Sequence, residues 1–452
     1  MNEVMVSQPV PEREAELDAL ERHVETALAE AARLGADAAE ASAGLQSGIN
    51  VNVRMGEVET IEHHSDHSIN VTVYFGRAKG QASSGDLKAE SITESVRRAC
   101  DIARHTEQDR CNGLADPDRL ATTFPDLDLW HPRALDVNQA IERALICEEA
   151  GRADSRITNS EGASASSALG LSVYGNSHGF FGRSSGTRHG QVCILIAGQG
   201  EGMQRDYWYD SRRAYEDLED PAETGRKAAA RTVARLGASQ VPTGRMPVLF
   251  SPEIARGVLG HLVSAVSGGA LYRNTSFLKD AAGQHLFPEW LTIAEMPMLP
   301  RAAGSAAFDS EGVATLERNL VDEGVLTGYV LSSYSARRLG LETTGNAGGV
   351  HNLRPRGAAR PFDSLVSDMG SGLLVTEVMG QGVQIVTGDY SRGASGFMIE
   401  NGRIGRPVAE VTIAGNLRNM FSSVVAMGDD VDDRANIACG SLWVDGMTVA
   451  GA

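Results

Sequence analysis

The spacing of apolar residues changes twice within the first hundred residues, and this change limits the folds open to the chain. Residues 11–43 are rich in Ala, Glu and Leu, which predicts one helix. From Gly48 to Ser84 apolar residues alternate with polar ones, which is typical of antiparallel strands, with short turns at Met55-Gly56 and Phe75-Gly76. Residues 86–106 return to a helical pattern. The opening unit is therefore predicted to be α+β.

The same order of elements recurs further along the chain. A polar stretch at residues 116–132 predicts a linker. A helix at 138–152 and a strand-rich block follow it, and a helix at 220–237 closes this second unit. No sequence repetition accompanies the similar order, so a structural duplication stays open. Many short strands and glycine turns then surround one helix at 252–267. We expect an α+β protein with a first α+β unit at 1–113, a second at 133–240, and a β-rich C-terminal domain at 241–452 with one or two inserted helices.

Composition excludes several kinds of partner. The chain has 41 basic and 59 acidic residues, a net charge of −18, which opposes phosphate backbones and anionic membranes. Its five cysteines are widely spaced and form no C-x-x-C pair, so a disulfide framework is not expected. Residues 1–10 lack the pattern of a signal peptide, and no apolar run approaches the ~20 residues of a membrane span. We expect a cytoplasmic protein that binds neither nucleic acid nor membrane directly.

The helix at 252–267 carries the first candidate site residue. Ser251-Pro252-Glu253 provides a start signal in which serine supplies an N-cap hydroxyl. Residues at steps of three and four share one helical face: Ile254, Val258, His261, Leu262 and Ala265. This apolar stripe predicts that His261 points inward. An isolated histidine on an apolar stripe is more often a core residue than a metal ligand.

Several strings in the C-terminal third are far more specific than any single motif. They are Tyr334–Gly340, Thr344–Asn352, Thr387–Gly393, Glu400–Gly402, Ile413–Asn416 and Asn436–Ser441. Together they resemble the TldD/PmbA family and, within it, the PmbA (TldE) branch. The resemblance implies a cytoplasmic metallopeptidase complex that pairs a TldD-type subunit with a PmbA-type subunit and degrades unfolded or short peptides or trims peptide precursors. The family has also been called a modulator of DNA gyrase.

The resemblance also implies which residues matter. TldD-type members carry an H-E-x-x-x-H zinc helix and a later cysteine ligand. Matched to this chain, the first histidine falls at His261, the glutamate at Leu262, the second histidine at Val266 and the cysteine at Cys439. Leu262 cannot accept a proton and Val266 cannot bind a metal. The resemblance therefore implies no catalytic residue here, relic positions at His261 and Cys439, and a TldD-type partner that supplies the zinc.

Two polar segments are candidates for lining a cleft or a subunit contact. A plain connecting loop explains the first equally well, and a hairpin cap is the slightly favoured interpretation of the second. The first comprises Arg273, Asn274, Thr275 and Ser276, and the second comprises Asp389, Tyr390, Ser391 and Arg392. A metal held by His63, Asp66 and His67 is less favoured than a solvated strand end and turn. The glycines of Thr344–Asn352 lack a phosphate-loop ending but could let an extended peptide approach the backbone.

The function expected from these observations is that of a non-catalytic subunit, which builds a peptide channel and stabilises its TldD-type partner. Two alternatives remain open. In the first, the chain is itself a metallopeptidase that uses His261, Cys439 and a histidine from elsewhere, such as His351 or His285. In the second, it is an adaptor or regulatory protein without a role in proteolysis. A homodimer of the isolated chain also stays open.

Overall fold

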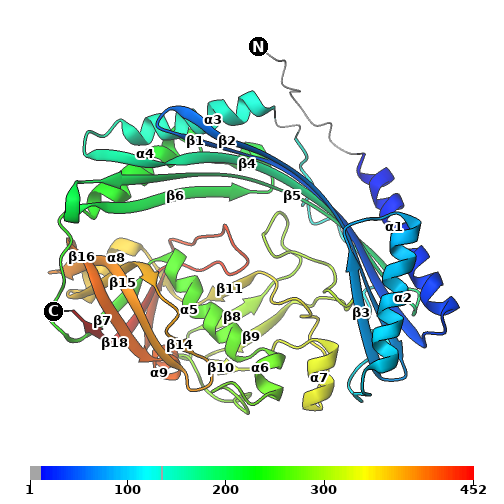
Figure 1. Cartoon of the computed structure of the whole chain (residues 1–452). Helices are drawn as coiled ribbons and strands as arrows, with labels where there is room; N and C mark the ends of the chain where they lie inside the picture. The colour runs from blue at the N-terminus through cyan, green and yellow to red at the C-terminus, as the bar shows by residue number, and fades with distance from the viewer. Residues whose placement is uncertain (1–11, 134–135, 452) are drawn as a thin grey trace. The chain divides into compact units, whose positions relative to one another are not determined.

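The computed structural model describes residues 12–133 and 136–451, and the chain divides into two compact units (Figure 1). Unit 1 holds the chain up to Gly198, together with Arg205–Val233 and Ala307–Ala314. Unit 2 holds Gln199–Gln204, Ala234–Ala306 and Thr315–Ala452. The fold class is mixed α+β, as the sequence predicted.

Unit 1 is built on one six-stranded sheet with the strand order β3-β2-β1-β4-β5-β6. β1 lies near the centre and pairs antiparallel with both β2 and β4. Each half of the sheet follows the order helix, three strands, helix, as the sequence pattern predicted. The elements are α1 (Arg13–Arg33), β1 (Ala38–Arg54), β2 (Glu57–Phe75), β3 (Ala78–Ser84), α2 (Ala89–His105), α3 (Val137–Arg152), β4 (Ile157–Asn176), β5 (Phe181–Ala197), β6 (Gln204–Arg212) and α4 (Pro221–Ala234).

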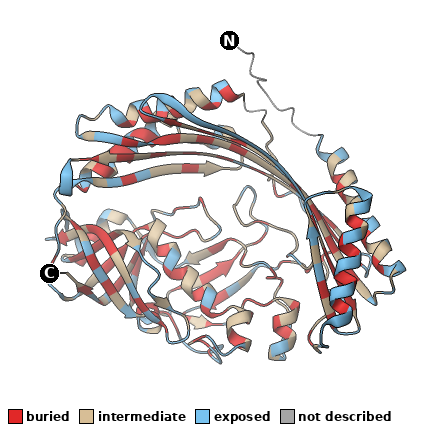
Figure 2. Cartoon of the chain, in the orientation of Figure 1, coloured by how far each residue is buried: buried red, intermediate tan, exposed pale blue. Residues whose placement is uncertain are grey.

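The sheet and its helices enclose two apolar clusters. Along β1, buried residues such as Val51 and Val53, each fully buried, alternate with more exposed neighbours, whereas Val71 and Val73 of β2 lie in a continuous buried run. Figure 2 shows this alternation as red bands along the strands and along the inner sides of α1 and α2. A second cluster lies beneath α3 and α4 and includes Cys147 and Cys193.

The first predicted helix is too long, because α1 ends at Arg33 and β1 already begins at Ala38. Gly35 adopts a positive φ of 82°, which ends the helix. Alanines 39, 41 and 43 are buried on the sheet face that packs against the helices, so tertiary burial overrides their helix propensity. The predicted turns at Met55-Gly56 and Phe75-Gly76 are confirmed as the β1–β2 and β2–β3 connections.

Unit 2 contains a closed barrel of five strands. β7 pairs parallel with β13 and antiparallel with β18, and the circuit is completed through β16 and β15. The barrel strands are β7 (Gly244–Phe250), β13 (Gly372–Met379), β15 (Asp389–Glu400), β16 (Arg403–Asn416) and β18 (Leu442–Ala450). β14 (Val383–Gln384), β17 (Val424–Gly428) and β12 (Ala359–Arg360) add to this sheet. A separate sheet has the order β10-β9-β8-β11, formed by β8 (Thr292–Glu295), β9 (Arg318–Asp322), β10 (Val325–Leu326) and β11 (Leu353–Arg356).

More helices are inserted into unit 2 than the one or two predicted. They are α5 (Pro252–Ala265), α6 (Gly268–Tyr272), α7 (Ser333–Leu339), α8 (Phe362–Met369) and α9 (Leu417–Ser422). The additional helices span five to eight residues, too short to give a clear helical periodicity in the sequence.

The glycine turns expected in this part of the chain include two hairpin connections. Glu323-Gly324 connects β9 to β10, and Asn401-Gly402 connects β15 to β16. All four residues have positive φ, as a type I′ turn requires at its two central positions.

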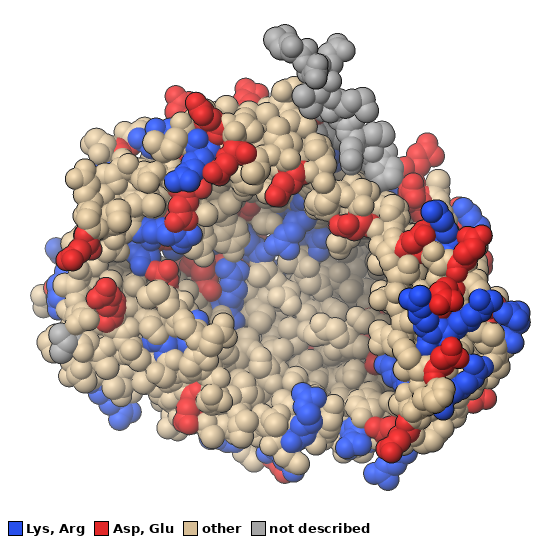
Figure 3. Space-filling model, viewed as in Figure 1, with Lys and Arg blue, Asp and Glu red and all other residues tan. Residues whose placement is uncertain are grey.

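Charged side chains of both signs cover the outer surface of α1 and α2, at the right of Figure 3. Some of them form short helical ion pairs, such as Arg33 with Glu30 and Arg98 with Glu94. Over residues 12–133 and 136–451, no helix is long and apolar enough to cross a membrane.

Candidate functional site

The helix α5 presents its apolar stripe to the core of unit 2. Ser251 is the N-cap residue and Pro252 starts the helix, but the Ser251 hydroxyl makes no capping hydrogen bond. The buried stripe comprises Ala255, Val258, Leu259, Leu262 and Ala265. The predicted helix is therefore confirmed, while the predicted hydroxyl cap is wrong.

Leu262 and Val266 are both completely buried. Each belongs to the main apolar cluster of unit 2, which also includes residues of the barrel. Burial of one such side chain contributes about 1.5–3 kcal/mol. The two positions where the zinc helix would need a glutamate and a histidine therefore serve as packing positions in this chain.

The sequence predicted that His261 points inward, and the structure places it at the margin of the buried stripe. Its side chain is half-buried, and its ring centroid lies 6.0 Å from that of Tyr390, with the planes at 70°. Burial lowers the pKa of His261, and the positive charge of Arg392 lowers it further. The imidazole is therefore neutral at neutral pH.

The predicted segment Asp389–Arg392 is divided between the two faces of β15. Tyr390 and Arg392 alternate with their neighbours and share the face that meets His261. Tyr390 is only 2% exposed, and burial raises its pKa to about 12. The Nε of Arg392 donates a hydrogen bond to the Met379 carbonyl oxygen at 3.0 Å, which fixes the Nε side of the guanidinium.

The other two residues of that segment, Asp389 and Ser391, are exposed. Asp389 accepts hydrogen bonds from Thr387 Oγ1 at 2.7 Å and from Asn416 Nδ2 at 3.4 Å. These bonds tie together the β14–β15 connection and the end of β16. Asp389 therefore stabilises a turn, and only Tyr390 and Arg392 accompany His261.

Cys439 is not brought to His261. Its Sγ lies 3.8 Å from the carbonyl oxygen of Pro252, at the first turn of α5. His261 follows nine residues later, roughly 13 Å along a helix that rises 1.5 Å per residue. The thiol is buried, and burial raises its pKa to about 12, so it stays protonated near neutral pH.

The other histidines considered as ligands do not complete a site either. The two ring nitrogens of His351 lie 3.2 Å from the carbonyl oxygens of Gly304 and Gly345, so both face backbone. His285 is exposed. Within the described parts of the chain, no three His, Cys, Asp or Glu side chains are arranged to hold a metal ion. The residues around His261 therefore do not fit a zinc site, which needs about three ligands and a nearby carboxylate.

The glycine-containing string Thr344–Asn352 encloses a buried ion pair that the sequence did not indicate. Glu295 is 1% exposed, and its carboxylate accepts hydrogen bonds from Arg318 Nε at 2.8 Å, Asn346 Nδ2 at 2.7 Å and the His351 amide at 2.7 Å. Arg318 also donates to Asn346 Oδ1 at 3.0 Å. The string therefore satisfies a buried charge, and no local sequence signal could link these residues across separations of 23 to 56 positions.

The segment Arg273–Ser276 also separates into different roles. Ser276 is buried, and its hydroxyl donates to the Ala265 carbonyl at 2.5 Å, so it fastens the loop to the end of α5. Arg273, Asn274 and Thr275 are exposed. The guanidinium of Arg273 lies 5.2 Å from the ring centroid of Tyr272. Ser276 is thus structural, while the three exposed residues remain available for contacts.

The histidine-rich segment lies in the middle of β2, which corrects the predicted strand end and turn. His63 and His67 share one face of the strand at a separation of roughly 13 Å, and Asp66 lies on the opposite face. They are exposed, as predicted, but cannot hold one metal ion together.

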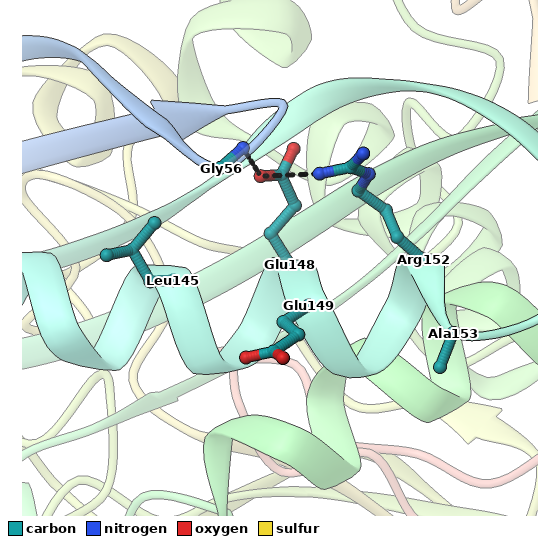
Figure 4. Close-up of a pocket in the computed structure, with 6 residues that line it drawn as sticks. All are labelled: Gly56, Leu145, Glu148, Glu149, Arg152 and Ala153. Atoms are coloured by element: carbon teal, nitrogen blue, oxygen red, sulfur yellow. Dashed lines mark hydrogen bonds and ion pairs between the residues drawn. The ribbon is translucent and has the colours of Figure 1, made fainter.

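A cavity of about 570 Å³ lies beside the tip of the β1–β2 hairpin (Figure 4). Its most buried acidic residue, Glu148 of α3, is 1% exposed and accepts the Met55 and Gly56 amides, each at 2.8 Å. Arg152 lies 4.0 Å from the same carboxylate. Figure 4 shows Glu148 between Gly56 and Arg152, whereas Glu149 points away from them. The carboxylate of Glu148 therefore anchors the hairpin to α3.

Three family models match the chain in succession: the PmbA/TldA metallopeptidase domain 1 over residues 39–103, the central domain over 130–236, and the C-terminal domain over 243–451. The chain belongs to the PmbA/TldD metallopeptidase family. It lies in the PmbA branch, because it is 47% identical to the metalloprotease PmbA of Escherichia coli O157:H7 over 97% of each chain.

Solved structures agree with this assignment. A Bacteroides thetaiotaomicron VPI-5482 protein, proposed to be a modulator of DNA gyrase, is 28% identical, with a TM-score of 0.90 over 96% of this chain and 99% of that one. TldE from Thermococcus kodakarensis has the same fold, with a TM-score of 0.82 at 19% identity over 96% of this chain and 100% of that one.

Proposed function

We propose that this chain is the non-catalytic, PmbA-type subunit of a zinc metallopeptidase complex. In this complex a TldD-type partner supplies the zinc and the catalytic glutamate, and the present chain contributes to the peptide channel. The observation that carries the proposal is the complete burial of Leu262 and Val266 in the core, at the two positions where the zinc helix needs polar side chains.

The surroundings of His261 support a role in peptide contact over one in hydrolysis. A neutral imidazole, a phenol whose pKa is about 12 and a guanidinium lie together, and burial keeps the first two uncharged near pH 7. Such a group can donate hydrogen bonds to backbone carbonyls or to a carboxylate. None of the three is a carboxylate that could accept a proton from a metal-bound water.

A competing function is favoured by the relatives' names, because the E. coli and Haemophilus influenzae proteins are called metalloprotease PmbA and its homologue. Under this alternative the isolated chain binds its own metal through His261. The separation of Cys439 from His261 and the occupied nitrogens of His351 weigh against it.

Metal analysis and peptidase assays of the purified chain, alone and mixed with a TldD-type partner, test the proposal. We expect less than 0.1 zinc per chain, no peptide cleavage by the chain alone, and cleavage by the mixture that exceeds that of the partner alone. Stoichiometric zinc that is lost on His261→Ala but kept on His285→Ala would identify the chain as a metallopeptidase itself. Partner activity that does not respond to this chain would instead favour an adaptor outside proteolysis.

Kinetics of the mixture test the peptide contact separately. Arg392→Gln should raise KM for the peptide about tenfold with little change in kcat, because a charge-assisted hydrogen bond is lost outside the catalytic centre. Arg403→Gln is the matched control, since Arg403 is exposed on the adjacent barrel strand. Equal KM values for the two variants would show that Arg392 does not contact the peptide.

A further inference from the structure

The side chains of His261, Tyr390 and Arg392 carry polar atoms without a partner in the part of the chain that the structure describes. The ring nitrogens of His261 and the hydroxyl of Tyr390 take part in no hydrogen bond there. Arg392 uses its Nε on the Met379 carbonyl oxygen, and its two terminal nitrogens form neither a hydrogen bond nor an ion pair. Buried polar groups are almost always hydrogen-bonded, yet Tyr390 is only 2% exposed. These unpaired groups therefore point to a ligand.

Two elements bring the three side chains together. Tyr390 and Arg392 are two positions apart on β15, so they share one face of the strand at a separation of roughly 7 Å. His261 of α5 meets this face edge-on, with its ring centroid 6.0 Å from that of Tyr390. The hydrogen bond from Arg392 to Met379 ties the Nε side of the guanidinium to β13 and leaves its two terminal nitrogens for a ligand.

Arg392 has no carboxylate partner within residues 12–133 and 136–451. The nearest acid along β15, Asp389, lies on the opposite face and accepts hydrogen bonds from Thr387 and Asn416. After burial, the positive charge of Arg392 is what acts on the pKa of His261 and on that of Tyr390. In a chain with a net charge of −18, this half-buried cation is thus kept apart from the abundant acids. A partly buried charge is costly unless it is paired, which favours an anionic ligand.

The available donors match a carboxylate better than a backbone carbonyl. The two terminal nitrogens of an arginine form a planar fork that fits both oxygens of a carboxylate. The Tyr390 hydroxyl and one nitrogen of the neutral His261 ring can each add a donor. A carboxylate has about four acceptor sites, whereas a carbonyl oxygen has about two and no charge to balance the guanidinium.

An apolar surface adjoins the cation. Met379 is 46% exposed and lies opposite Gly393 in the pairing of β13 with β15. A methyl group added at Gly393 would come within 3.5 Å of the Met379 Cβ, so the thioether side chain lies beside the strand position that follows Arg392. A peptide residue can therefore place a carboxylate on Arg392 and aliphatic carbon on Met379.

We infer that His261, Tyr390 and Arg392 bind a carboxylate group of the peptide, and that Arg392 determines this specificity. The carboxylate belongs either to the C-terminus of the peptide or to an Asp or Glu side chain. The inference rests on the proposed function in taking the ligand to be a peptide. Its test is binding to the chain alone, so its outcome is separate from the zinc and peptidase measurements that test the proposed function.

Four matched peptides test the inference by fluorescence anisotropy with the purified chain near pH 7. All are dansyl-labelled ten-residue peptides of Gly, Ser, Ala and Leu. The first pair ends in a free carboxylate or in an amide, and the second pair ends in amides and carries an internal Glu or Gln. Within one pair, the peptide with the carboxylate should bind about tenfold more tightly, because a charge-assisted hydrogen bond is gained. The pair that shows the difference identifies the source of the carboxylate.

Variants assign the difference to the three side chains. Arg392→Gln should abolish it and leave binding of the uncharged peptides unchanged, whereas Arg392→Lys should keep part of it, because the charge remains and the fork is lost. Tyr390→Phe retains the ring and removes the hydroxyl, so it should reduce the difference. Arg403→Gln is the matched control on the adjacent strand and should keep the full tenfold difference. A circular dichroism melt of each variant confirms that it folds.

The inference is overturned by equal binding within both peptide pairs, or by no binding of any of the four peptides at the highest attainable chain concentration. It is also overturned by a difference that persists in Arg392→Gln, which would assign carboxylate recognition to another part of the chain. A chain that discriminates the carboxylate but leaves the activity of a TldD-type partner unchanged would keep this inference and remove the proposed function.

Discussion

Leu262→Glu introduces the carboxylate that a zinc helix would carry, and the structure predicts that the change is severely destabilising. Leu262 is completely buried in the apolar cluster of unit 2. Loss of its burial costs about 1.5–3 kcal/mol. A glutamic acid kept protonated at pH 7 costs about 3.7 kcal/mol more, because the proton is held 2.7 pH units above its ordinary pKa of about 4.3. The sum of about 5–7 kcal/mol approaches the whole stability of a typical domain.

The charge component has a definite pH dependence. Burial raises the pKa of the introduced carboxyl in the folded state, so the folded chain binds an extra proton and loses stability as pH rises. While the pH lies between the unfolded and folded pKa values, each unit by which it is lowered below 7 should restore about 1.4 kcal/mol to the free energy of unfolding of Leu262→Glu. Leu262→Gln lacks this charge, so its cost should be the same at pH 5 and pH 7.

Urea unfolding measures these costs. Trp130 and Trp208 belong to unit 1, so replacing both with Phe leaves Trp290 and Trp443 to report on unit 2. Ser264→Glu, at an exposed position two residues along α5, is the matched control and should change the free energy of unfolding by less than about 0.5 kcal/mol. A cost below 1 kcal/mol for Leu262→Glu would refute the argument, because it would place that side chain in a polar cleft.

The double substitution Leu262→Glu with Val266→His addresses the metal directly. Cys439 lies near the other end of α5, so we expect no stoichiometric zinc and no zinc-dependent stabilisation. A real site would raise the free energy of unfolding by about 2.7 kcal/mol at a free zinc concentration of 100 Kd. A gain of that size in a folded double variant would show that other side chains complete the site.

Three further measurements test separate parts of the structure. Glu148→Gln should lower the stability of unit 1 by about 2–4 kcal/mol in urea unfolding and speed hydrogen exchange at the hairpin tip, whereas the exposed Glu149→Gln should change neither. The pKa of His261, measured by NMR, should lie below 6.5. In Arg392→Gln this pKa should rise but stay below 6.5, since burial is the larger cause of the shift. The neutral imidazole should therefore contribute stability above about pH 6.5, and this contribution should be lost as pH falls through the folded pKa. Arg318→Met should cost about 3–5 kcal/mol, because it leaves a buried carboxylate unpaired; a cost below 1 kcal/mol would contradict the buried network.

Local chemistry explains which parts of the fold were predictable. Asn401-Gly402 and Glu323-Gly324 determine their turns through positive φ angles that few residue pairs adopt readily, so the hairpins followed from two residues each. The start of β1 was missed because its alanines favour a helix in isolation and become a strand only through burial against α1 and α2. Closure of the barrel joins β7 to β18, about 200 positions apart, and no sequence periodicity encodes such a contact.

The candidate site was predictable only as far as it lies on one helix. Helical spacing placed Leu262 correctly on the buried stripe of α5 and His261 next to it, because positions along one helix have fixed relative directions. Val266 was located through the family match instead, and it is the C-cap residue that follows α5. Matching a later string to the family's cysteine gave an order along the chain and no distance, and the structure places Cys439 beside Pro252 instead. Tyr390 and Arg392 were predicted as a group with Asp389 and Ser391, but the alternation of β15 selects only the first pair to meet His261.

This arrangement gives a physical reason why the proposed loss of catalysis would be difficult to reverse. A working zinc helix keeps polar side chains in a partly buried position, which costs stability that only a bound metal offsets. Leu262 and Val266 remove that cost and add buried apolar surface to the core of unit 2. Restoring the polar pair one residue at a time would pass through a destabilised chain without a metal site. The same substitutions leave the half-buried His261 and Arg392 at the margin of the core, beside the buried Tyr390, and the proposed peptide contact needs no contribution from a metal.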